Sequence, residues 1–261
     1  MYPLTPWVKR LLIANVVVHV LAKLSGPLLY NLGALVPTEV AMRPWTLVTY
    51  MFLHAPGLSH LFLNMLSLFF FGPRLEERLG GRDFLRLYFL GGLGGAAFSF
   101  VFAPQDAVVG ASAAIFAVMI GFAMFWPRER IYIWGIIPVE AWLLVIAMVG
   151  INLYWGFGSM NQGVASFAHL GGAAFGFAFL KWLLWKRGAS RRDFQRKLQD
   201  TPSAPLSDRT AMERWEAIDT KALHQLNRDE VEVLLHKVRA GGVRLLTPAE
   251  RAFLDRMTTQ H

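Results

Sequence analysis

Six apolar segments along the chain constrain its fold more than any other feature. Several of them are near the ~20 residues that an α-helix needs to cross a bilayer. Hydrophobic residues make up 54% of the 261 positions and charged residues 17%, and a soluble core of this size would not need such segments. The sequence therefore predicts an all-α, polytopic membrane protein. Its six-helix bundle is expected to cross the membrane at residues 8–30, 60–73, 84–102, 110–126, 131–154 and 163–185.

The chain is basic, with a net charge of +8 and a pI near 10.0, which fits either nucleic acid or a membrane surface as partner. Lys and Arg gather at the ends of the apolar segments, as the positive-inside rule predicts. We therefore expect a lipid bilayer and no nucleic acid. One side of the predicted membrane carries Lys9, Arg10, the four arginines from Arg74 to Arg86, Arg128, Arg130 and the cluster at 186–192, and the other little beyond Lys23 and Arg43. This asymmetry predicts that both termini are cytoplasmic.

The first apolar segment is similar to a secretory signal peptide, because Lys9 and Arg10 precede the apolar residues 11–22. No small-residue cleavage site of the A-x-A kind follows it, so we expect a retained first span. The sequence has no cysteine, which excludes disulfides, a thiol nucleophile and cysteine-ligated metal.

The composition changes after the last apolar segment, and the remaining residues are charged and far less apolar. We predict three regions: a six-span domain at 1–187, a partly disordered linker at 188–226, and a small cytosolic helical hairpin at 227–258. Pro, Ser and Thr at 201–205 are typical of a flexible linker. A solvated tail with transient helices is the alternative.

Two sequence patterns predict the helices of this hairpin. Asn227–Glu230 resembles a capping box, followed by apolar residues at helical spacing and then by the pair Gly241-Gly242. Thr247–Glu250 predicts a second helix start, with Thr as cap, Pro at the first position and Glu at the third. No motif in this region carries chemistry.

Four polar residues inside the apolar segments are candidates for a site, because polar groups in a bilayer are costly and usually functional. Ser112 lies near the start of the fourth segment, His169 near the start of the sixth, and His60 and Asn64 in the second. These segments enter the membrane from the same side, so the four residues lie at similar depth. His60 and Asn64 share one helix face because they are four positions apart. We expect the four side chains to converge.

The residue types indicate acyl transfer by a serine nucleophile. A serine hydroxyl needs an adjacent base, and histidine serves because its pKa lies near physiological pH. His60, Asn64 and the Ser112 backbone N–H can stabilise the oxyanion. No acidic residue lies at this depth, so a dyad of Ser112 and His169 is favoured over a triad, and Glu140 is not expected to take part. Taken alone, Ser112 could be a small packing residue, and His169 could form a hydrogen bond to a neighbouring carbonyl. All four groups together favour an intramembrane protease.

Small residues on the fourth and sixth segments would let the two helix backbones approach closely, as small-xxx-small spacing does in membranes. Without that approach Ser112 and His169 could not touch. The facing residues are Gly110, Ala111, Ala113 and Ala114 on one segment and Ala168, Gly172 and Gly176 on the other.

These residues resemble the rhomboid family of intramembrane serine proteases, over about residues 5–187. The resemblance implies that Ser112 is the nucleophile and His169 the base, with His60 and Asn64 as oxyanion donors. Phe116 would pack against the base, and Gly110 belongs to the motif around the serine. The matching stretches are Leu53–Ala55, His60–Ser67, Phe71–Gly72, Leu87–Leu90 and Ala168–Gly172.

The resemblance further implies cleavage of transmembrane segments of other proteins, no cofactor or metal, and a bacterial plasma membrane. The family motif is Gly-x-Ser-Gly, whereas this chain has Ala113 after the serine. Its methyl group could crowd the oxyanion pocket or be harmless. A non-catalytic rhomboid-like protein that binds membrane clients is therefore the alternative. A metalloprotease fits worse because no H-E-x-x-H pair is present, and an aspartyl protease would need two carboxylates within the spans.

Overall fold

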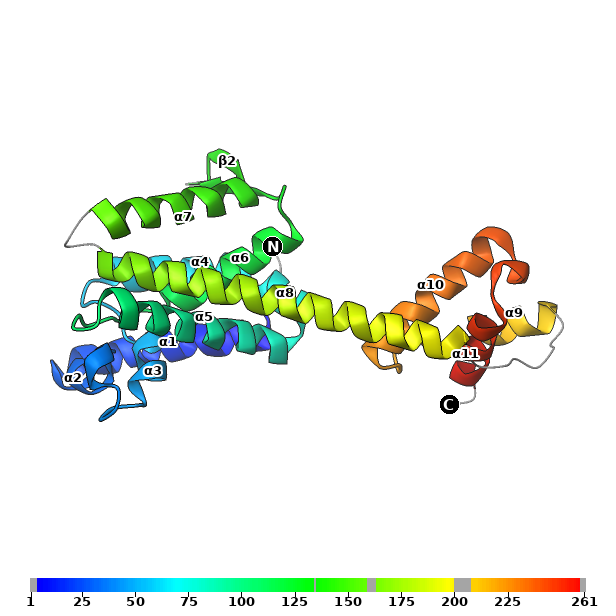
Figure 1. Cartoon of the computed structure of the whole chain (residues 1–261), viewed down its shortest axis with the longest axis horizontal. Coiled ribbons are helices and arrows are strands. Elements are labelled where there is room, and N and C mark those ends of the chain that lie inside the picture. The colour runs from blue at the N-terminus through cyan, green and yellow to red at the C-terminus, as the bar shows by residue number, and fades with distance from the viewer. Residues whose placement is uncertain (1–3, 134, 159–162, 200–207, 259–261) are drawn as a thin grey trace. The chain divides into compact units, whose positions relative to one another are not determined.

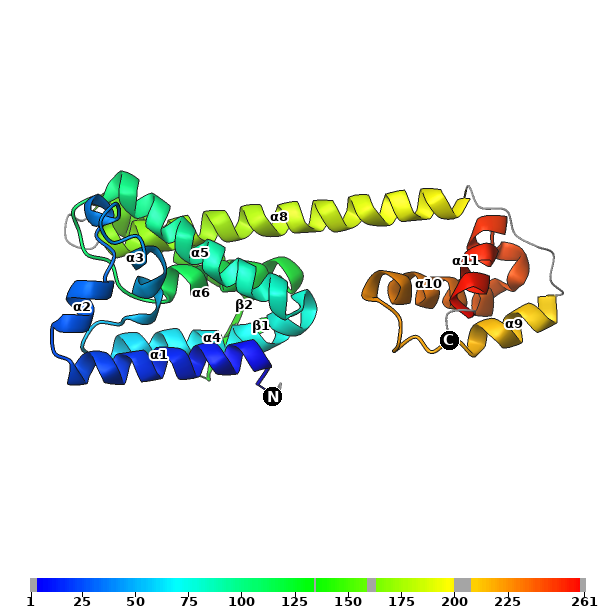
Figure 2. The same ribbon diagram turned by 90° about the horizontal axis from the view of Figure 1, so that it is seen from below.

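The structure is a computed structural model that describes residues 4–133, 135–158, 163–199 and 208–258. It divides into two compact units, residues 1–182 and 183–261. Figures 1 and 2 show the elements from two directions. In chain order they are α1 (Pro6–Leu24), α2 (Leu28–Gly33), η1 (Pro37–Glu39), α3 (Thr46–Thr49), η2 (Tyr50–Phe52), α4 (Leu58–Leu79), α5 (Gly81–Phe102), α6 (Ser112–Phe125), β1 (Arg130–Ile133), β2 (Ile137–Glu140), α7 (Ala141–Gly158), α8 (Gly163–Gln199), α9 (Asp208–Glu216), α10 (Gln225–Gly241), η3 (Val243–Leu245) and α11 (Pro248–Thr258).

The first unit is built around α6, whose residues 113–119 are all buried. Helices α4, α5 and α7 pack on it, and α1 lies along α4 (Figure 2). The first part of α8 also packs on α6, because Gly172 and Gly176 lie against Ala113 and Ala117. This is the close approach of the fourth and sixth segments that the sequence predicts.

Three helices of the described residues are long and apolar enough to cross a membrane: α5, α7 and residues 165–189 of α8. Helix α6 is apolar but shorter. All six predicted segments contain a helix, although four of them have different ends. Helix α1 stops at Leu24, before Gly26 at φ +60° and Pro27, so the predicted continuation to residue 30 is wrong.

Helix α4 continues past the Gly72-Pro73 pair where the sequence predicted its end. Pro73 lies inside the helix, and the apolar face continues through the buried Leu75 and Leu79. That burial stabilises the last turns and offsets the hydrogen bond that proline removes. The helix ends at Gly80, which has φ +82°.

A β-hairpin occupies the beginning of the predicted fifth span, which was therefore placed ten residues too early. Strands β1 and β2 pair antiparallel, with Arg130 opposite Glu140, and α7 begins only at Ala141. Gly135 has φ +73° and Pro138 lacks an N–H, so a continuous helix is unfavourable here.

Helices also lie where the sequence predicted a linker at 188–226. Helix α8 runs to Gln199 instead of ending near Trp185, and α9 begins at Asp208. Lys, Arg, Gln and Leu are good helix formers, and proline is absent between residues 163 and 201, so the helix propagates. The predicted linker residues 201–205 lie outside the described residues.

In the described part of the second unit, α9, α10 and α11 pack together, whereas the sequence predicts a hairpin of two helices. Trp215 of α9 is 1% exposed, and its indole N–H donates to Asp255 Oδ1 of α11 over 2.9 Å. The predicted capping box at the start of α11 is confirmed: Thr247 N donates to Glu250 Oε2 and Glu250 N to Thr247 Oγ1. The predicted cap at Asn227 is wrong, because the cap position of α10 is His224, three residues earlier.

A buried carboxylate closes the N-terminus of α1. Glu76 of α4 is 5% exposed and accepts hydrogen bonds from the backbone N–H groups of Trp7 and Val8 and from the Thr5 hydroxyl. The first N–H groups of a helix lack intrahelical partners and favour negative charge. Glu76 therefore fixes α1 against α4.

Candidate active site

Ser112 is the first residue of α6, and glycine at position 110 shapes the turn before it. Gly110 has φ +131°, and a Cβ there would lie 2.9 Å from His60 Cε1. Its N–H donates to Tyr50 O over 2.9 Å. Only glycine fits both the backbone conformation and the close approach, so Gly110 brings the start of α6 against the His60 ring.

The structure brings Ser112 and His169 into hydrogen-bond contact, with 2.7 Å between Ser112 Oγ and His169 Nε2. The contact joins α6 to α8, and the glycines of α8 make it possible. A Cβ on Gly172 would collide with the carbonyl oxygen of Ala113. The two backbones therefore touch one turn from the serine–histidine pair.

Phe116 of α6 stacks on the imidazole of His169. The two ring centroids are 4.6 Å apart and the planes differ by 7°. Phe116 is 7% exposed. The ring therefore restricts the rotation of His169 about its side-chain bonds, as expected from the resemblance.

His60 of α4 presents one ring edge to the start of α6. Its Nδ1 accepts the N–H of Ala55 over 3.2 Å, so in the neutral ring the proton is on Nε2. A Cβ built on Gly110 would be 3.1 Å from this Nε2 and 3.5 Å from Ser112 Oγ. The His60 Nε2–H is therefore a donor next to the serine.

Asn64 lies one turn along α4 from His60 and is 6% exposed. Its Nδ2 donates to the carbonyl oxygen of His60 over 2.8 Å. One amide N–H is thus used within the helix, and the second is left for another acceptor. Of the four predicted residues, the structure joins Ser112 and His169 by a hydrogen bond and places the His60 ring against Gly110, with Asn64 one turn along α4 from His60.

Two further histidines lie behind His60. His54 is fully buried, its ring centroid is 5.2 Å from that of His60, and its carbonyl oxygen accepts the Tyr30 hydroxyl. The ring of His19 lies 6.4 Å from His54. These contacts support the position of His60. Among the described residues, no group of three His, Cys, Asp or Glu side chains is arranged to hold a metal ion.

Sequence reasoning missed Asn152 of α7, whose Oδ1 lies 2.8 Å from His169 Nδ1. The available signal is a polar amide within an apolar segment, whereas the sequence argument for a dyad rests on the lack of an acidic residue at this depth. Glu140, the acidic residue of the predicted fifth span, lies in β2 and accepts the indole N–H of Trp142. The histidine is thus contacted at both ring nitrogens, by Ser112 and by Asn152.

This arrangement can perform nucleophilic catalysis. The Ser112 hydroxyl lies against a histidine nitrogen that can take its proton, and two hydrogen-bond donors near the serine could stabilise a substrate oxygen that becomes negative. The donors are the Ser112 backbone N–H at the start of α6 and His60 Nε2–H. The N-terminus of a helix also carries partial positive charge, which favours an anion there.

Comparison with known proteins gives the same family that the sequence resembles. The model of the Rhomboid domain matches residues 41–187, which contain Ser112 and His169. RHOMBOID-like protein 2 of Arabidopsis thaliana is 37% identical over 157 residues, 59% of this chain and 47% of the relative. RHOMBOID-like protein 6, mitochondrial, of the same plant is 34% identical over 179 residues, 67% of this chain and 56% of the relative.

Rhomboid-like protease 3 of Toxoplasma gondii is 34% identical over 151 residues, 57% of this chain and 55% of the relative. The chain spans about half the length of the curated relatives it matches. The matched domain covers more than half of the 261 residues, and the apolar helices α5, α7 and α8 agree with an integral membrane protein. The chain therefore belongs to the rhomboid family.

Proposed function

We propose that this chain is an intramembrane serine endopeptidase that cleaves transmembrane segments of other membrane proteins. The observation that carries the proposal is the 2.7 Å contact between Ser112 Oγ and His169 Nε2. Family membership supports it, because the family includes intramembrane proteases. The contact supplies what a serine nucleophile requires, namely a base within hydrogen-bond reach.

In the first step, Ser112 Oγ attacks the carbonyl carbon of a substrate peptide bond while His169 Nε2 takes the hydroxyl proton. The carbonyl oxygen becomes an oxyanion, and the Ser112 N–H, His60 Nε2–H and the second amide N–H of Asn64 donate to it. Removing one such donor typically costs about 10²–10³ in rate. Phe116 keeps the protonated imidazole in place.

In the second step, the tetrahedral intermediate collapses and the carbon–nitrogen bond breaks. His169 Nε2–H gives its proton to the leaving amine, which produces an acyl-enzyme on Ser112. Water then attacks the ester, His169 takes a proton from that water, and the same donors stabilise the second oxyanion. Ser112 regains its proton as the carboxylic product leaves. No cofactor or metal takes part.

The proposed topology has six membrane spans, formed by α1, α4, α5, α6, α7 and residues 163–185 of α8. The basic residues at the junction of α4 and α5 and after α6 support a cytoplasmic location for those turns and for both termini. The proposed location, a bacterial plasma membrane, rests only on the resemblance to the rhomboid family. The proposed organisation is a membrane domain followed by a small cytosolic helical unit.

A fluorophosphonate probe tests the proposal without knowledge of the substrate. The protein is purified in mild detergent and labelled beside Ser112→Ala, His169→Ala and a control, Ser67→Ala. Ser67 also lies in a helix of the first unit, but its hydroxyl donates to the carbonyl oxygen of Leu63. We expect labelling of the wild type and the control, none of Ser112→Ala, and a decrease of about 10²–10⁴ in rate for His169→Ala.

A folded wild type that does not react with the probe would contradict the proposal and favour the alternative, a rhomboid-like protein that binds membrane clients without cleaving them. Labelling that persists in Ser112→Ala would place the reactive group elsewhere. In either case the Ser112–His169 contact would have to be explained as packing between α6 and α8.

A further inference from the structure

The orientation of the Asn152 amide determines which nitrogen of His169 carries the proton. Asn152 Nδ2 donates to the carbonyl oxygen of Met148 over 2.8 Å, so the atom that faces His169 Nδ1 at 2.8 Å is the oxygen Oδ1. An amide oxygen only accepts hydrogen bonds, and therefore Nδ1 must be the donor. In neutral His169 the other nitrogen, Nε2, then has a free lone pair.

That lone pair points at the nucleophile. His169 Nε2 lies 2.7 Å from Ser112 Oγ, and in this tautomer it accepts the serine hydroxyl proton. The opposite tautomer would place an N–H against the hydroxyl and could not act as a base. A hydrogen bond at one ring nitrogen is the usual way in which proteins set the state of the other.

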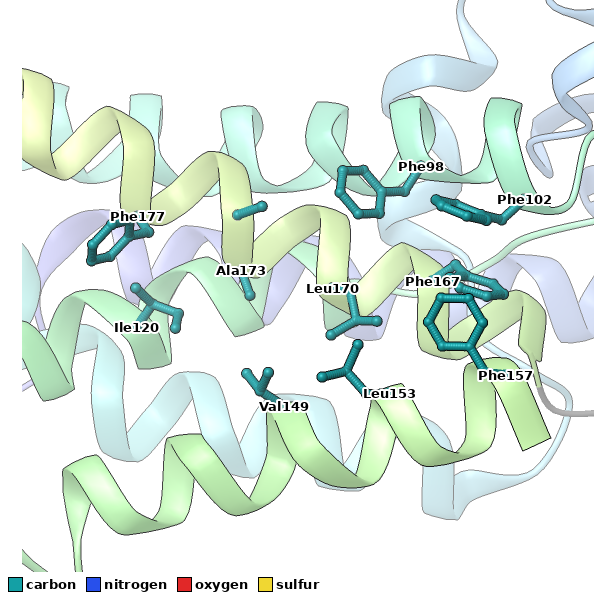
Figure 3. Close-up of a pocket in the computed structure, with 11 residues that line it drawn as sticks. Phe98, Phe102, Ile120, Val149, Leu153, Phe157, Phe167, Leu170, Ala173 and Phe177 are labelled. Carbon is teal, nitrogen blue, oxygen red and sulfur yellow. The ribbon is translucent and has the colours of Figure 1, made fainter. Parts of the chain in front are cut away.

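Asn152 comes from the helix of the first unit that is otherwise packed most loosely. Only 6% of the apolar stretch of α7 is buried, against 50% of the apolar stretches of α5 and α8. The buried residues of α7 are Ala141 and Asn152. An apolar cavity of about 390 Å³ lies between α7 and α8 (Figure 3), lined on the α7 side by Val149, Leu153 and Phe157. Side chains flanking Asn152 thus line this cavity, whereas Asn152 itself is 9% exposed.

We propose that Asn152 is a positioning residue that holds His169 as the Nδ1–H tautomer and aims its Nε2 at Ser112. The site is then a Ser-His-Asn array in which the third member is an amide on α7. The inference rests on the proposed function, since a tautomer matters only if His169 acts as the base. Asn152 itself makes no contact with the reacting atoms.

The test compares Asn152→Leu, which has similar volume and no acceptor, with Asn152→Asp, which keeps an oxygen in the same place. Asn15→Leu is the matched control. Asn15 of α1 is also buried and also donates its Nδ2 to the carbonyl four residues earlier, Leu11 O at 2.8 Å, but it does not contact His169. Each full-length variant is titrated with the fluorophosphonate probe, which separates the limiting rate from the concentration at half-saturation.

We expect Asn152→Leu to lower the limiting rate roughly 10–100-fold, the range typical when the hydrogen-bond partner of a metal-bound histidine is removed, with little change in half-saturation. Asn152→Asp should retain more of the rate than Asn152→Leu, and Asn15→Leu should react like the wild type. If Asn152 had only a structural role, Asn152→Leu and Asn15→Leu should lower the limiting rate to a similar extent, because each loses a hydrogen bond from an amide to a backbone carbonyl.

The tautomer itself is measured by ¹⁵N NMR of histidine-labelled protein, with the His169 signals assigned from the spectrum of His169→Gln. The wild type should show protonated Nδ1 and unprotonated Nε2, a pattern lost in Asn152→Leu. Protonated Nε2 in the wild type, or an unchanged rate in folded Asn152→Leu, would overturn the inference. The wild-type spectrum decides the matter even if Asn152→Leu does not fold. A wild type that does not label would instead contradict the proposed function.

Discussion

Ala113 follows the candidate nucleophile where the family motif has glycine, and its methyl group faces α5. The side chain is 2% exposed, and a Cβ built on Gly95 would lie 2.5 Å from Ala113 Cβ. The His60 ring lies by contrast next to Gly110. Because the methyl group packs against α5, we expect that it does not crowd the oxyanion pocket.

Ala113→Gly is therefore expected to leave the rate of fluorophosphonate labelling essentially unchanged. It should lower the stability of the first unit by about 1 kcal/mol, because glycine is a poorer helix former than alanine. Labelling kinetics and the midpoint of thermal unfolding in detergent measure the two effects. A large gain in labelling rate would show that the methyl group limits the site.

The site was predictable where a costly polar group lies within an apolar segment. Ser112, His169 and His60 give this signal, and the structure places Ser112 against His169 and the His60 ring against Gly110, two residues before the serine. Asn152 gives the same signal, but its role depends on which of its amide atoms faces His169, and no spacing rule states that. Glu76 was missed because its partners lie about seventy positions away at the start of α1.

At the level of elements, the contact between α6 and α8 sets the distance between nucleophile and base. A Cβ on Gly172 would collide with the Ala113 carbonyl oxygen, which belongs to the backbone and cannot turn aside. Gly150 of α7 offers a comparison, since nothing lies within 4 Å of a Cβ built there. The same glycine-to-alanine change thus meets opposite surroundings in the two helices.

Gly172→Ala should separate α8 from α6, abolish probe labelling and cost about 1–3 kcal/mol of stability, as overpacking typically does. Gly150→Ala should label normally and gain up to about 1 kcal/mol from helix propensity. Labelling and thermal unfolding of both variants check this. Equal labelling of the two would mean that the helix contact does not control the site.

The elements were predictable where apolar length was the signal and less so at their ends. Whether Pro73 ends a helix depends on what the residues after it bury, and here Leu75 and Leu79 are buried. The hairpin of β1 and β2 is apolar enough to resemble the start of a span. Tertiary packing determines that α4 continues past Pro73. The backbone conformation of Gly135 and the missing N–H of Pro138 determine that a hairpin forms before α7.

At the scale of the whole molecule, the second unit has its own core and its own electrostatic support. Burial raises the pKa of Glu250, but hydrogen bonds from Lys237 and Thr247 outweigh it and hold that pKa below its usual 4.5. Lys237 Nζ lies 2.8 Å from Glu250 Oε1. The folded unit therefore favours the ionised carboxylate.

Because the folded pKa is the lower one, this stabilisation is complete above the unfolded value and is lost as the pH falls through the folded value. We expect hydrogen exchange in α11 to accelerate as the pH is lowered below about 4.5, after correction for the intrinsic rate. Glu250→Gln should exchange faster at neutral pH and respond less to acid. Glu232→Gln, at an exposed position of α10, is the matched control, and an equal effect of both substitutions would contradict the assignment.

The division into two units was only partly predictable. The change in composition marks the tail, but the burial of Trp215 depends on Asp255 and the apolar face of α11, forty positions later. A local pattern for α9 alone gives no reason to expect a third packed helix. The sequence signal at Thr247 and Glu250, by contrast, is local, and the structure confirms it.

Under the proposed function, the short length of α6 would decide what becomes of a cleaved substrate. Its 14 residues rise about 21 Å at ~1.5 Å each, whereas the hydrocarbon layer is ~30 Å thick. If the far end of α6 lies at one face of that layer, Ser112 lies about 9 Å below the other face, a depth of ~6 helical residues. A substrate span cut at that level would be divided unequally. The outward fragment would keep too few apolar residues to stay anchored and would leave the membrane, while the other would keep about 14 of the ~20 required and would remain embedded without spanning the bilayer.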